Sequence, residues 1–367
     1  MNEPAFVPGL QLSRDFYHQA VLPLLDRALP DTAHSAALMG TGSEVLGLDT
    51  DRSRDHDWGP RLQLFLSARD SACHGAYLRE HLANRLPSTF RGHPTHFEPT
   101  GEAPGIGVAG PTDGPVEHRV HITDPATWFT DHLGFDPARG ITVADWMAIP
   151  TQRLAEATGG ALFHDGLGLL APVRSALARY PRQVWMHVLA CQWLRVSQRE
   201  AFVGRCAEVG DELGSAVVTA HLARDLMRLS LLMDGRYPPY DKWLGSTFAR
   251  TRQGQDLAPH LRSALCATDG HTREDHLCRV YEALARRHNR LGLSAPVDAS
   301  TRLFHTRPFR VLGAERLCAA LRESITDPRV RALPVVGAID QWVDSTDVLT
   351  RPDRFRAVAE GLTGPGV

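Results

Sequence analysis

The chain has 367 residues, a formal net charge of −2 and 43% hydrophobic residues, so it can bury a full core and is long enough for two domains. A charge this close to zero excludes a protein-wide basic surface, so we expect small molecules, mononucleotides or a protein as partners rather than nucleic acid. No stretch approaches about 18 continuous apolar residues and no signal-peptide pattern opens the chain, so we expect no membrane span and a cytoplasmic location.

The first part of the chain predicts a small mixed sheet with helices on one face. Apolar residues recur at helical spacing in residues 13–29, with Ser13 as the expected N-cap. Alternating or continuous apolar runs predict strands over 35–39, 62–66, 89–97 and 116–123, with a helix over 68–86 and a Gly/Pro-rich connection over 100–115.

Beyond about residue 140 the apolar residues follow the helical period in long segments: 143–158, 171–180, 182–198, 211–234, 256–266, 273–291 and 314–325. Few strand signals remain, so we expect an α+β protein in which a mixed-sheet domain, residues 1–138, is followed by an all-helical bundle, residues 139–367. Since ligands favour domain interfaces, the substrate pocket is expected between them.

Metal-binding and disulfide patterns are missing from the cysteines and histidines. The six cysteines form no Cys-x-x-Cys pair, which predicts reduced thiols that are buried or half-buried. The histidines lack the spacing of metal ligands, and His164-Asp165 reads as a turn with a helix N-cap. The segment 340–347, with three carboxylates, reads as a solvated helix end, the alternative being a second ligand surface.

A Gly-Ser turn and a pair of carboxylates lie close together in the sequence. Gly42-Ser43 follows the first predicted strand, and Asp55-His56-Asp57 comes eleven residues later, just before the second. Glycine lets the backbone approach a phosphate, and a serine hydroxyl can hydrogen-bond its oxygens. Two carboxylates one residue apart on an extended segment would share a face and fit Mg²⁺ between protein and substrate phosphates. The alternative is a chance combination of a turn and a loop.

These residues resemble the signature of nucleotidyltransferases of the DNA polymerase beta type: Gly, then Gly or Ser, a gap of about ten, then Asp-x-Asp. The longer string from Gly42 to Pro60 resembles one bacterial branch of that superfamily, catalogued as a domain of unknown function. Further similarity to that branch lies at residues 204–205, 210–215, 237–243, 307–309 and 340–347. The resemblance implies a nucleotidyltransferase fold and reaction but no acceptor substrate.

The helical half contributes candidate phosphate ligands. Lys242 is the single lysine among 40 basic residues, in the segment Tyr237-Pro-Pro-Tyr-Asp-Lys-Trp, and resembles the lysine that related nucleotidyltransferases present to the triphosphate. A lysine retained by chance is the alternative. We include Tyr237 with the nucleotide site. Arg224 and Arg228 share a helix face and are interpreted equally well as phosphate ligands or as part of a surface ion-pair network.

The resemblance implies attack by an acceptor hydroxyl on the α-phosphate of a nucleoside triphosphate, with ATP as the expected donor and pyrophosphate leaving. Asp55 and Asp57 would hold two Mg²⁺ ions. A third carboxylate normally comes from a later strand, where this chain offers Glu117 at the edge and His121 more centrally; His121 is a candidate base. The alternative is a catalytically inactive nucleotide-binding or partner-regulating protein on the same fold.

Overall fold

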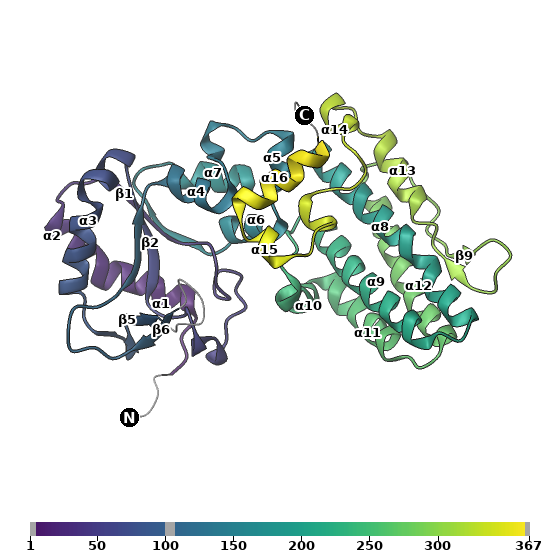
Figure 1. Cartoon of the computed structure of the whole chain (residues 1–367), viewed down its shortest axis with the longest axis horizontal. Coiled ribbons are helices and arrows are strands. Elements are labelled where there is room, and N and C mark those ends of the chain that lie inside the picture. Colours follow the sequence, from purple (N-terminus) through teal and green to yellow (C-terminus); the bar gives the residue numbers. More distant parts are fainter. Residues whose placement is uncertain (1–4, 100–106, 364–367) are drawn as a thin grey trace. The chain divides into compact units, whose positions relative to one another are not determined.

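The computed structural model describes residues 5–99 and 107–363, apart from the side chains of Asp55, Leu362 and Thr363. The chain forms two compact units. One, the α/β unit, comprises Met1–Ile141 and Arg153–Ala178, and the other, the helical unit, comprises Thr142–Gln152 and Arg179–Val367 (Figure 1). The predicted single domain boundary after residue 138 therefore differs from the structure, in which the chain returns to the first unit after residue 152.

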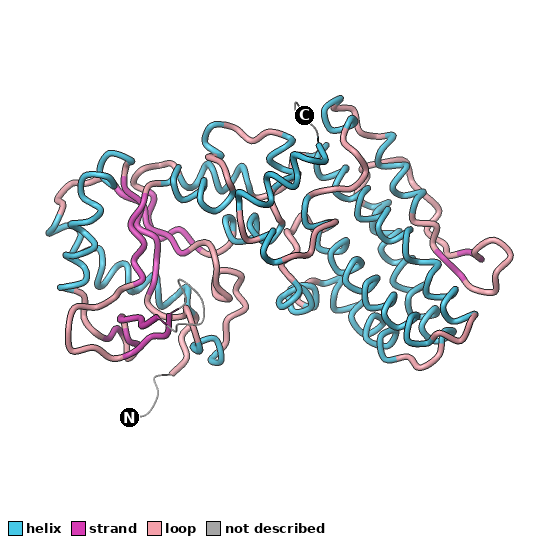
Figure 2. The backbone as a smooth tube through the Cα atoms, in the orientation of Figure 1, coloured by secondary structure: helices cyan, strands magenta, loops and turns pink. Residues whose placement is uncertain are grey.

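The α/β unit contains a four-stranded mixed sheet in the order β7-β2-β1-β8 (Figure 2). Strand β2 (Arg61–Leu66) runs antiparallel to β1 (His34–Leu38) and parallel to β7 (Arg119–Thr123). Strand β8 (Ala161–Asp165) pairs with the other side of β1, with Ser35 opposite Asp165. The α+β class and the small mixed sheet are confirmed, but β8 lies in a region for which the sequence predicts only helices.

Apolar residues point to both faces of this sheet: Leu62, Leu64 and Leu66 to one, and Phe65, which packs edge to face against Trp128, to the other. Leu62, Leu64 and Leu66 form a core with residues of the helices that cover their face, including Leu12 and Leu78. The covering elements are α1 (Gly9–Phe16), a π-helical turn (Tyr17–Val21), α2 (Leu22–Ala28) and α3 (Ala68–Arg85).

The N-cap predicted at Ser13 is wrong, and the first helix begins earlier. Helix α1 starts after Pro8, so Ser13 lies within it and is fully buried. The buried face of the helix already includes Gly9 and Leu12, and this burial extends the helix upstream of the serine.

The strand predicted over 89–97 is broken into two-residue and four-residue pieces. Arg91 and Gly92 both have positive φ, which makes a tight turn between β3 (Thr89–Phe90) and β4 (His93–Pro94). Strand β5 (His96–Pro99) then pairs with β6 (Gly107–Gly110). The remaining elements of this unit are η2 (Asp51–Asp55), α4 (Pro125–Leu133), η3 (Pro137–Arg139), most of α6 (Thr151–Thr158) and α7 (Leu170–Leu177).

Helices dominate the second unit, and α8 (Arg182–Glu208) and α9 (Glu212–Met233) are the longest. Gly210, with φ of 74°, ends the first, and the Asp211 carboxylate accepts the Gly214 N–H at 2.7 Å to cap the second. The other elements are α5 (Val143–Ala148), α10 (Asp241–Ala249), α11 (Arg252–Cys266), α12 (Gly270–Arg290), β9 (Arg302–Leu303), β10 (Arg310–Val311), α13 (Glu315–Glu323), α14 (Pro328–Ala332), η4 (Ile339–Gln341), α15 (Thr346–Leu349) and α16 (Pro352–Thr363).

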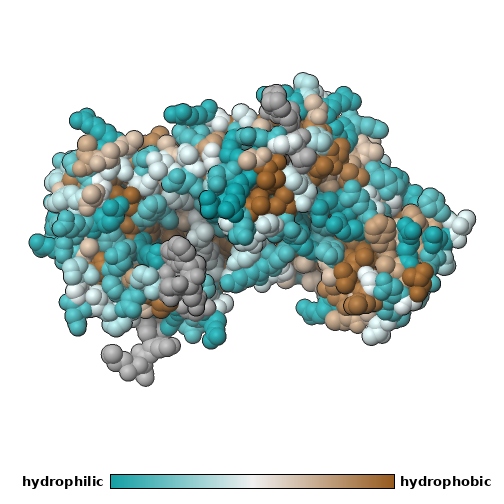
Figure 3. Space-filling view, in the orientation of Figure 1, coloured by the Kyte–Doolittle hydropathy of each residue, from teal (hydrophilic) through white to brown (hydrophobic). Residues whose placement is uncertain are grey.

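Hydrophilic and apolar side chains alternate over the surface in Figure 3. The most exposed large apolar residues are Val209 and Leu213, at the turn between α8 and α9. Among the described residues, no helix combines the length and apolar character that crossing a membrane requires. All six cysteines are free; Cys73 and Cys266 are exposed, which the prediction of buried or half-buried thiols missed.

Candidate functional site

Three segments meet at one edge of the four-stranded sheet. Because Ala37 of β1 lies opposite Gln63 of antiparallel β2, the end of β1 and the start of β2 share this edge. The parallel register of β2 and β7 brings Arg119, the first residue of β7, beside Arg61 at the same edge. The Gly42-Ser43 turn, the segment that ends with Asp57 and the start of β7 therefore come together, in the order that the sequence predicts for the first two.

The Gly42-Ser43 turn holds the guanidinium of Arg61. Arg61 donates to the Thr41 carbonyl oxygen at 2.6 Å and, through Nε, to the buried Glu44 carboxylate at 2.8 Å. A Cβ atom on Gly42 would lie 2.1 Å from Arg61 Nη2, so the close approach requires glycine here. Ser43 is half-buried in the same turn. In this structure the glycine thus accommodates an arginine of the chain itself.

Asp57 lies in a turn that two hydrogen bonds to Gly107 hold in place. The expectation that Asp55 and Asp57 share an extended segment is therefore wrong. Asp55 ends the 3₁₀ turn η2, His56 is extended, and Asp57 has φ of 49°. The Asp57 N–H donates to the Gly107 carbonyl oxygen at 2.9 Å, and the Gly107 N–H donates to Asp57 Oδ1 at 3.0 Å. This reciprocal pair of bonds holds the left-handed conformation, which aspartate tolerates better than most residues. The side chain of Asp55 lies outside the described part of the structure.

Arg119 pairs with the Asp57 carboxylate. Its Nη2 lies 3.4 Å from Asp57 Oδ1, with about a third of each side chain exposed. The guanidinium also lies over the ring of Phe97, 5.4 Å from the centroid, and a Cβ on Gly107 would approach its Nη2 to 2.2 Å. Asp57 Oδ2 takes part in no hydrogen bond with the described residues. Sequence reasoning missed Arg119, although it shares the strand alternation of Glu117 and His121.

The two candidates for a third catalytic group lie on or before β7. Glu117 is exposed, and its backbone N–H donates to His96 Nδ1 at 2.9 Å. His121 is also exposed and lies two residues beyond Arg119, in register with Gln63. Although the side chain reaches solvent, neighbouring groups partly desolvate its ring, and this desolvation, with a smaller effect of Arg79, lowers the pKa of His121. Within the described part of the chain, no three His, Cys, Asp or Glu side chains lie close enough to hold a metal ion.

The other predicted nucleotide ligands belong to the helical unit. Arg224 pairs with Asp241 at 2.7 Å, and Asp241 begins α10. Lys242 lies in the first turn of the same helix, with Nζ 5.0 Å from the centroid of the Trp243 ring. Tyr237 is 8% exposed and packs edge to face against Tyr180. Arg224 and Lys242 thus flank Asp241, whereas Tyr237 is part of the core.

Arg228 is a buried residue with a structural ion pair. It is 3% exposed and donates to Asp340 Oδ2 at 2.8 Å, and the backbone N–H of Thr151 donates to the same oxygen at 3.0 Å. Although burial lowers it, the Asp340 carboxylate raises the pKa of Arg228 overall. The interpretation of Asp340 as part of a solvated helix end is wrong, because this pair lies in the core. A buried pair of this kind orients its elements and leaves Arg228 no access to a ligand.

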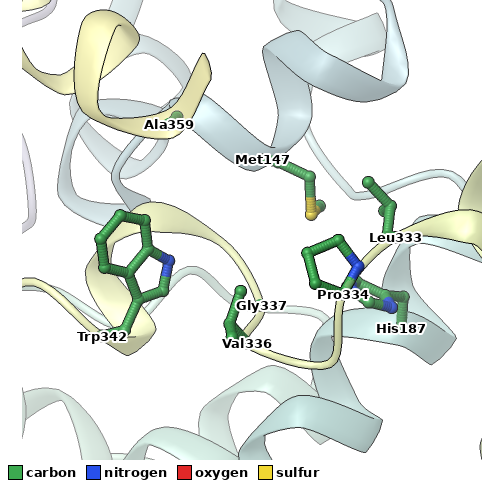
Figure 4. Close-up of a pocket in the computed structure, with 8 residues that line it drawn as sticks. All are labelled: Met147, His187, Leu333, Pro334, Val336, Gly337, Trp342 and Ala359. Atoms are coloured by element: carbon green, nitrogen blue, oxygen red, sulfur yellow. The ribbon is translucent and has the colours of Figure 1, made fainter. Parts of the chain in front are cut away.

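A small cavity in the helical unit does not suit a nucleotide. Side chains from α5, α8, α16 and the segment before and after η4 line it, with Met147, His187 and Trp342 among them (Figure 4). Its volume of about 10 Å³ holds a single water molecule. The sheet edge is therefore the better candidate for a nucleotide.

Comparison with known proteins bears on the middle of the chain, which includes residues 153–178 of the α/β unit and part of the helical unit. Among curated proteins, none matches it. A family model described as a domain of unknown function, DUF4037, matches residues 146–244. This segment is similar to that family and contains Arg224, Arg228, Tyr237 and Lys242, whereas the sheet edge with Gly42 and Asp57 lies outside the match.

Proposed function

We propose that this chain is a Mg²⁺-dependent nucleotidyltransferase of the DNA polymerase beta type, which transfers a nucleoside monophosphate, with ATP as the donor, to a hydroxyl group of a small molecule or protein. The observation that carries the proposal is the meeting of the Gly42-Ser43 turn, Asp57 and the start of β7 at one sheet edge. A turn that offers backbone groups and a carboxylate beside it supply the two kinds of ligand that a metal-bound triphosphate needs.

The Asp57 carboxylate can bind a divalent cation through one of its two oxygens, Oδ2. The carboxylate is 37% exposed, and the contacts that it makes with described residues, to Gly107 and Arg119, involve Oδ1 rather than Oδ2. Asp57, together with Asp55 of the same motif, would hold the metal, and Mg²⁺ bound there would neutralise phosphate charge and orient the triphosphate. Arg119 competes for the same carboxylate, and a bound triphosphate would offer its guanidinium an alternative anion.

In the proposed reaction, the acceptor oxygen forms a bond to the α-phosphorus and the bond to the pyrophosphate oxygen breaks. The hydroxyl proton goes to a base, for which His121 and Glu117 are the candidates; the lowered pKa of His121 favours the neutral ring, which is the form that can accept a proton. Ser43 and the backbone of Gly42 bind the outer phosphates. Of the ligands that the sequence suggests on the helical unit, Tyr237 and Arg228 are excluded because both are buried. Lys242 and Arg224 stay expectations of the resemblance and are not part of the proposed site.

A specific observation favours a second function, that of a nucleotide-binding protein without turnover. The Asp57 carboxylate is already paired with a cation, and the described residues supply no third carboxylate beside it. A protein that only binds the nucleotide needs phosphate ligands but not a set of metal ligands. The two functions share a binding site and differ in chemistry.

The test is to incubate the protein with Mg²⁺ and each α-labelled nucleoside triphosphate, and to measure nucleotide binding, pyrophosphate release and self-labelling. Turnover that Asp57→Asn lowers by at least about 100-fold, while Asp256→Asn on the exposed face of α11 changes nothing, supports the transferase. Nucleotide binding without pyrophosphate release, tested with a panel of hydroxyl acceptors, supports the second function. Absence of any nucleotide binding, with or without Mg²⁺, overturns both.

A further inference from the structure

A second cavity, of about 130 Å³, lies in the helical unit between the start of α8 and the end of α9. Aromatic side chains form its walls: Tyr180, Trp185 and Tyr237. Arg179 and Arg236 also line it, and both are exposed. The cavity is therefore lined by aromatic side chains and by two arginines that are also exposed to solvent.

The end of α9 shapes this cavity. Gly235 has φ of 65°, its N–H donates to the Leu232 carbonyl oxygen, and the Arg236 N–H donates to the Leu231 carbonyl oxygen, both at 3.0 Å. These two bonds form a Schellman motif, which turns the chain sharply after the helix. Trp185 Nε1 donates to the Leu232 carbonyl oxygen at 2.7 Å and so fixes the indole against the same turn. The cavity is thus built by backbone geometry and is preformed.

The positive charges of Arg179 and Arg236 are not paired with a carboxylate of the described residues, because none lies within ion-pair distance of either guanidinium. The lining carboxylate, Asp234, is paired with Arg287 of α12. Arginines without a carboxylate partner are common among the described residues, but Arg179 and Arg236 line the same aromatic cavity, and two guanidinium groups at one cavity suit an anionic ligand.

We propose that this cavity binds a small aromatic carboxylate: one ring among the aromatic side chains, with its carboxylate on Arg179 and Arg236. The volume sets the size, because a cavity of about 150 Å³ holds benzene and drug-sized ligands need roughly 300 Å³ or more. Edge-to-face packing, as between Tyr180 and Tyr237 with centroids 5.1 Å apart, suits a further ring. A nucleotide is too large, so the site is separate from that of the proposed function.

The test titrates 4-fluorobenzoate into the full-length protein and follows its ¹⁹F signal by NMR. We expect saturable binding, weakened about ten-fold in Arg236→Gln and in Arg179→Gln, since each removes a charge-assisted hydrogen bond. Arg262→Gln is the matched control, because Arg262 is exposed on α11 and does not line the cavity. The neutral analogue 4-fluorobenzamide should bind about ten-fold more weakly than the carboxylate.

Two outcomes overturn the proposal directly: no saturation up to about 10 mM probe, or equal weakening of binding in Arg262→Gln. A third is that inorganic phosphate displaces the probe and binds as tightly as 4-fluorobenzoate does, which would mean that the aromatic walls contribute nothing to the affinity. Both cavity arginines are exposed, so we expect their glutamine variants to fold, and circular dichroism checks this. Nucleotide binding should be unchanged in them, which separates this site from the sheet edge.

Discussion

At the scale of single residues, two arginines contact the residues that the sequence predicts to bind phosphate and metal. Arg61 and Arg119 are the first residues of two parallel strands and lie in register. One fills the glycine turn and the other pairs with Asp57. The order of the Gly-Ser turn and the aspartates could be predicted because both lie within one short segment. The Asp57–Arg119 pair could not, because it depends on the register of β2 with β7, which no local pattern reveals.

Removing the charge of Arg119 should strengthen metal binding at Asp57. In Arg119→Gln the carboxylate loses a competing cation, so we expect several-fold tighter binding of Mn²⁺, used as a probe for Mg²⁺, by electron paramagnetic resonance titration. The free energy of unfolding should change by less than about 1 kcal/mol, because the pair is partly exposed. Arg69→Gln, an exposed residue of α3, serves as the control. Unchanged or weaker Mn²⁺ binding in Arg119→Gln would remove Asp57 from the metal site.

At the scale of elements, the sequence predicts helices well and strand pairing poorly. Helix periodicity and caps are local, so α3, α9 and α12 lie within a few residues of their predicted ranges. The predicted helix over 143–158 is interrupted because Pro150 lacks a backbone N–H. Strand β8 depends on pairing with β1, more than a hundred residues earlier, and its short apolar run gives no sign of that partner.

Asp165 links these two kinds of element and should be important for stability. The helix N-cap predicted at His164-Asp165 is wrong in position, because Asp165 ends β8 and Leu169 is the N-cap of α7. The Asp165 carboxylate nevertheless accepts the Ser35 hydroxyl at 2.7 Å and the Ala171 N–H in the first turn of α7 at 2.9 Å. We expect Asp165→Ala to lower the free energy of unfolding by about 1 to 2 kcal/mol in urea titrations, through loss of the Ala171 hydrogen bond and of the Ser35 partner. Asp256→Ala, at an exposed position without these contacts, should cost much less. Equal losses in both variants would contradict the linking role.

At the scale of the whole molecule, the chain crosses between its two units more than once, which a composition shift near residue 140 cannot show. In the helical unit, Arg228 and Asp340 meet although 112 residues separate them. Each looks like a surface residue in its own segment, and only the packed unit makes them a buried pair. The sequence therefore predicts the class of each half, whereas the polar contacts inside them follow from packing.

Buried neutral histidines occur in both units and should make the folded protein sensitive to acid. Burial lowers the pKa of His132 to about 3 in the α/β unit, and the pKa values of His187 and His288 to about 4 in the helical unit; Arg153 and Arg322 add to the effect at the first two. In the unfolded chain a histidine has a pKa near 6.5. Stability present above pH 6.5 is therefore lost as the pH falls toward 4, because only the unfolded chain takes up protons there.

His288 offers the sharpest measurement of this effect, because burial alone lowers its pKa. Its contribution to the loss of unfolding free energy between pH 7 and pH 4.5 should be about 2 to 3 kcal/mol. His288→Gln keeps an acceptor for Trp193 Nε1 and does not titrate, so urea titrations at the two pH values should show a loss smaller by that amount. His221→Gln, at an exposed position of α9, is the matched control. If His288→Gln loses as much stability as the unaltered protein, His288 does not carry the acid sensitivity.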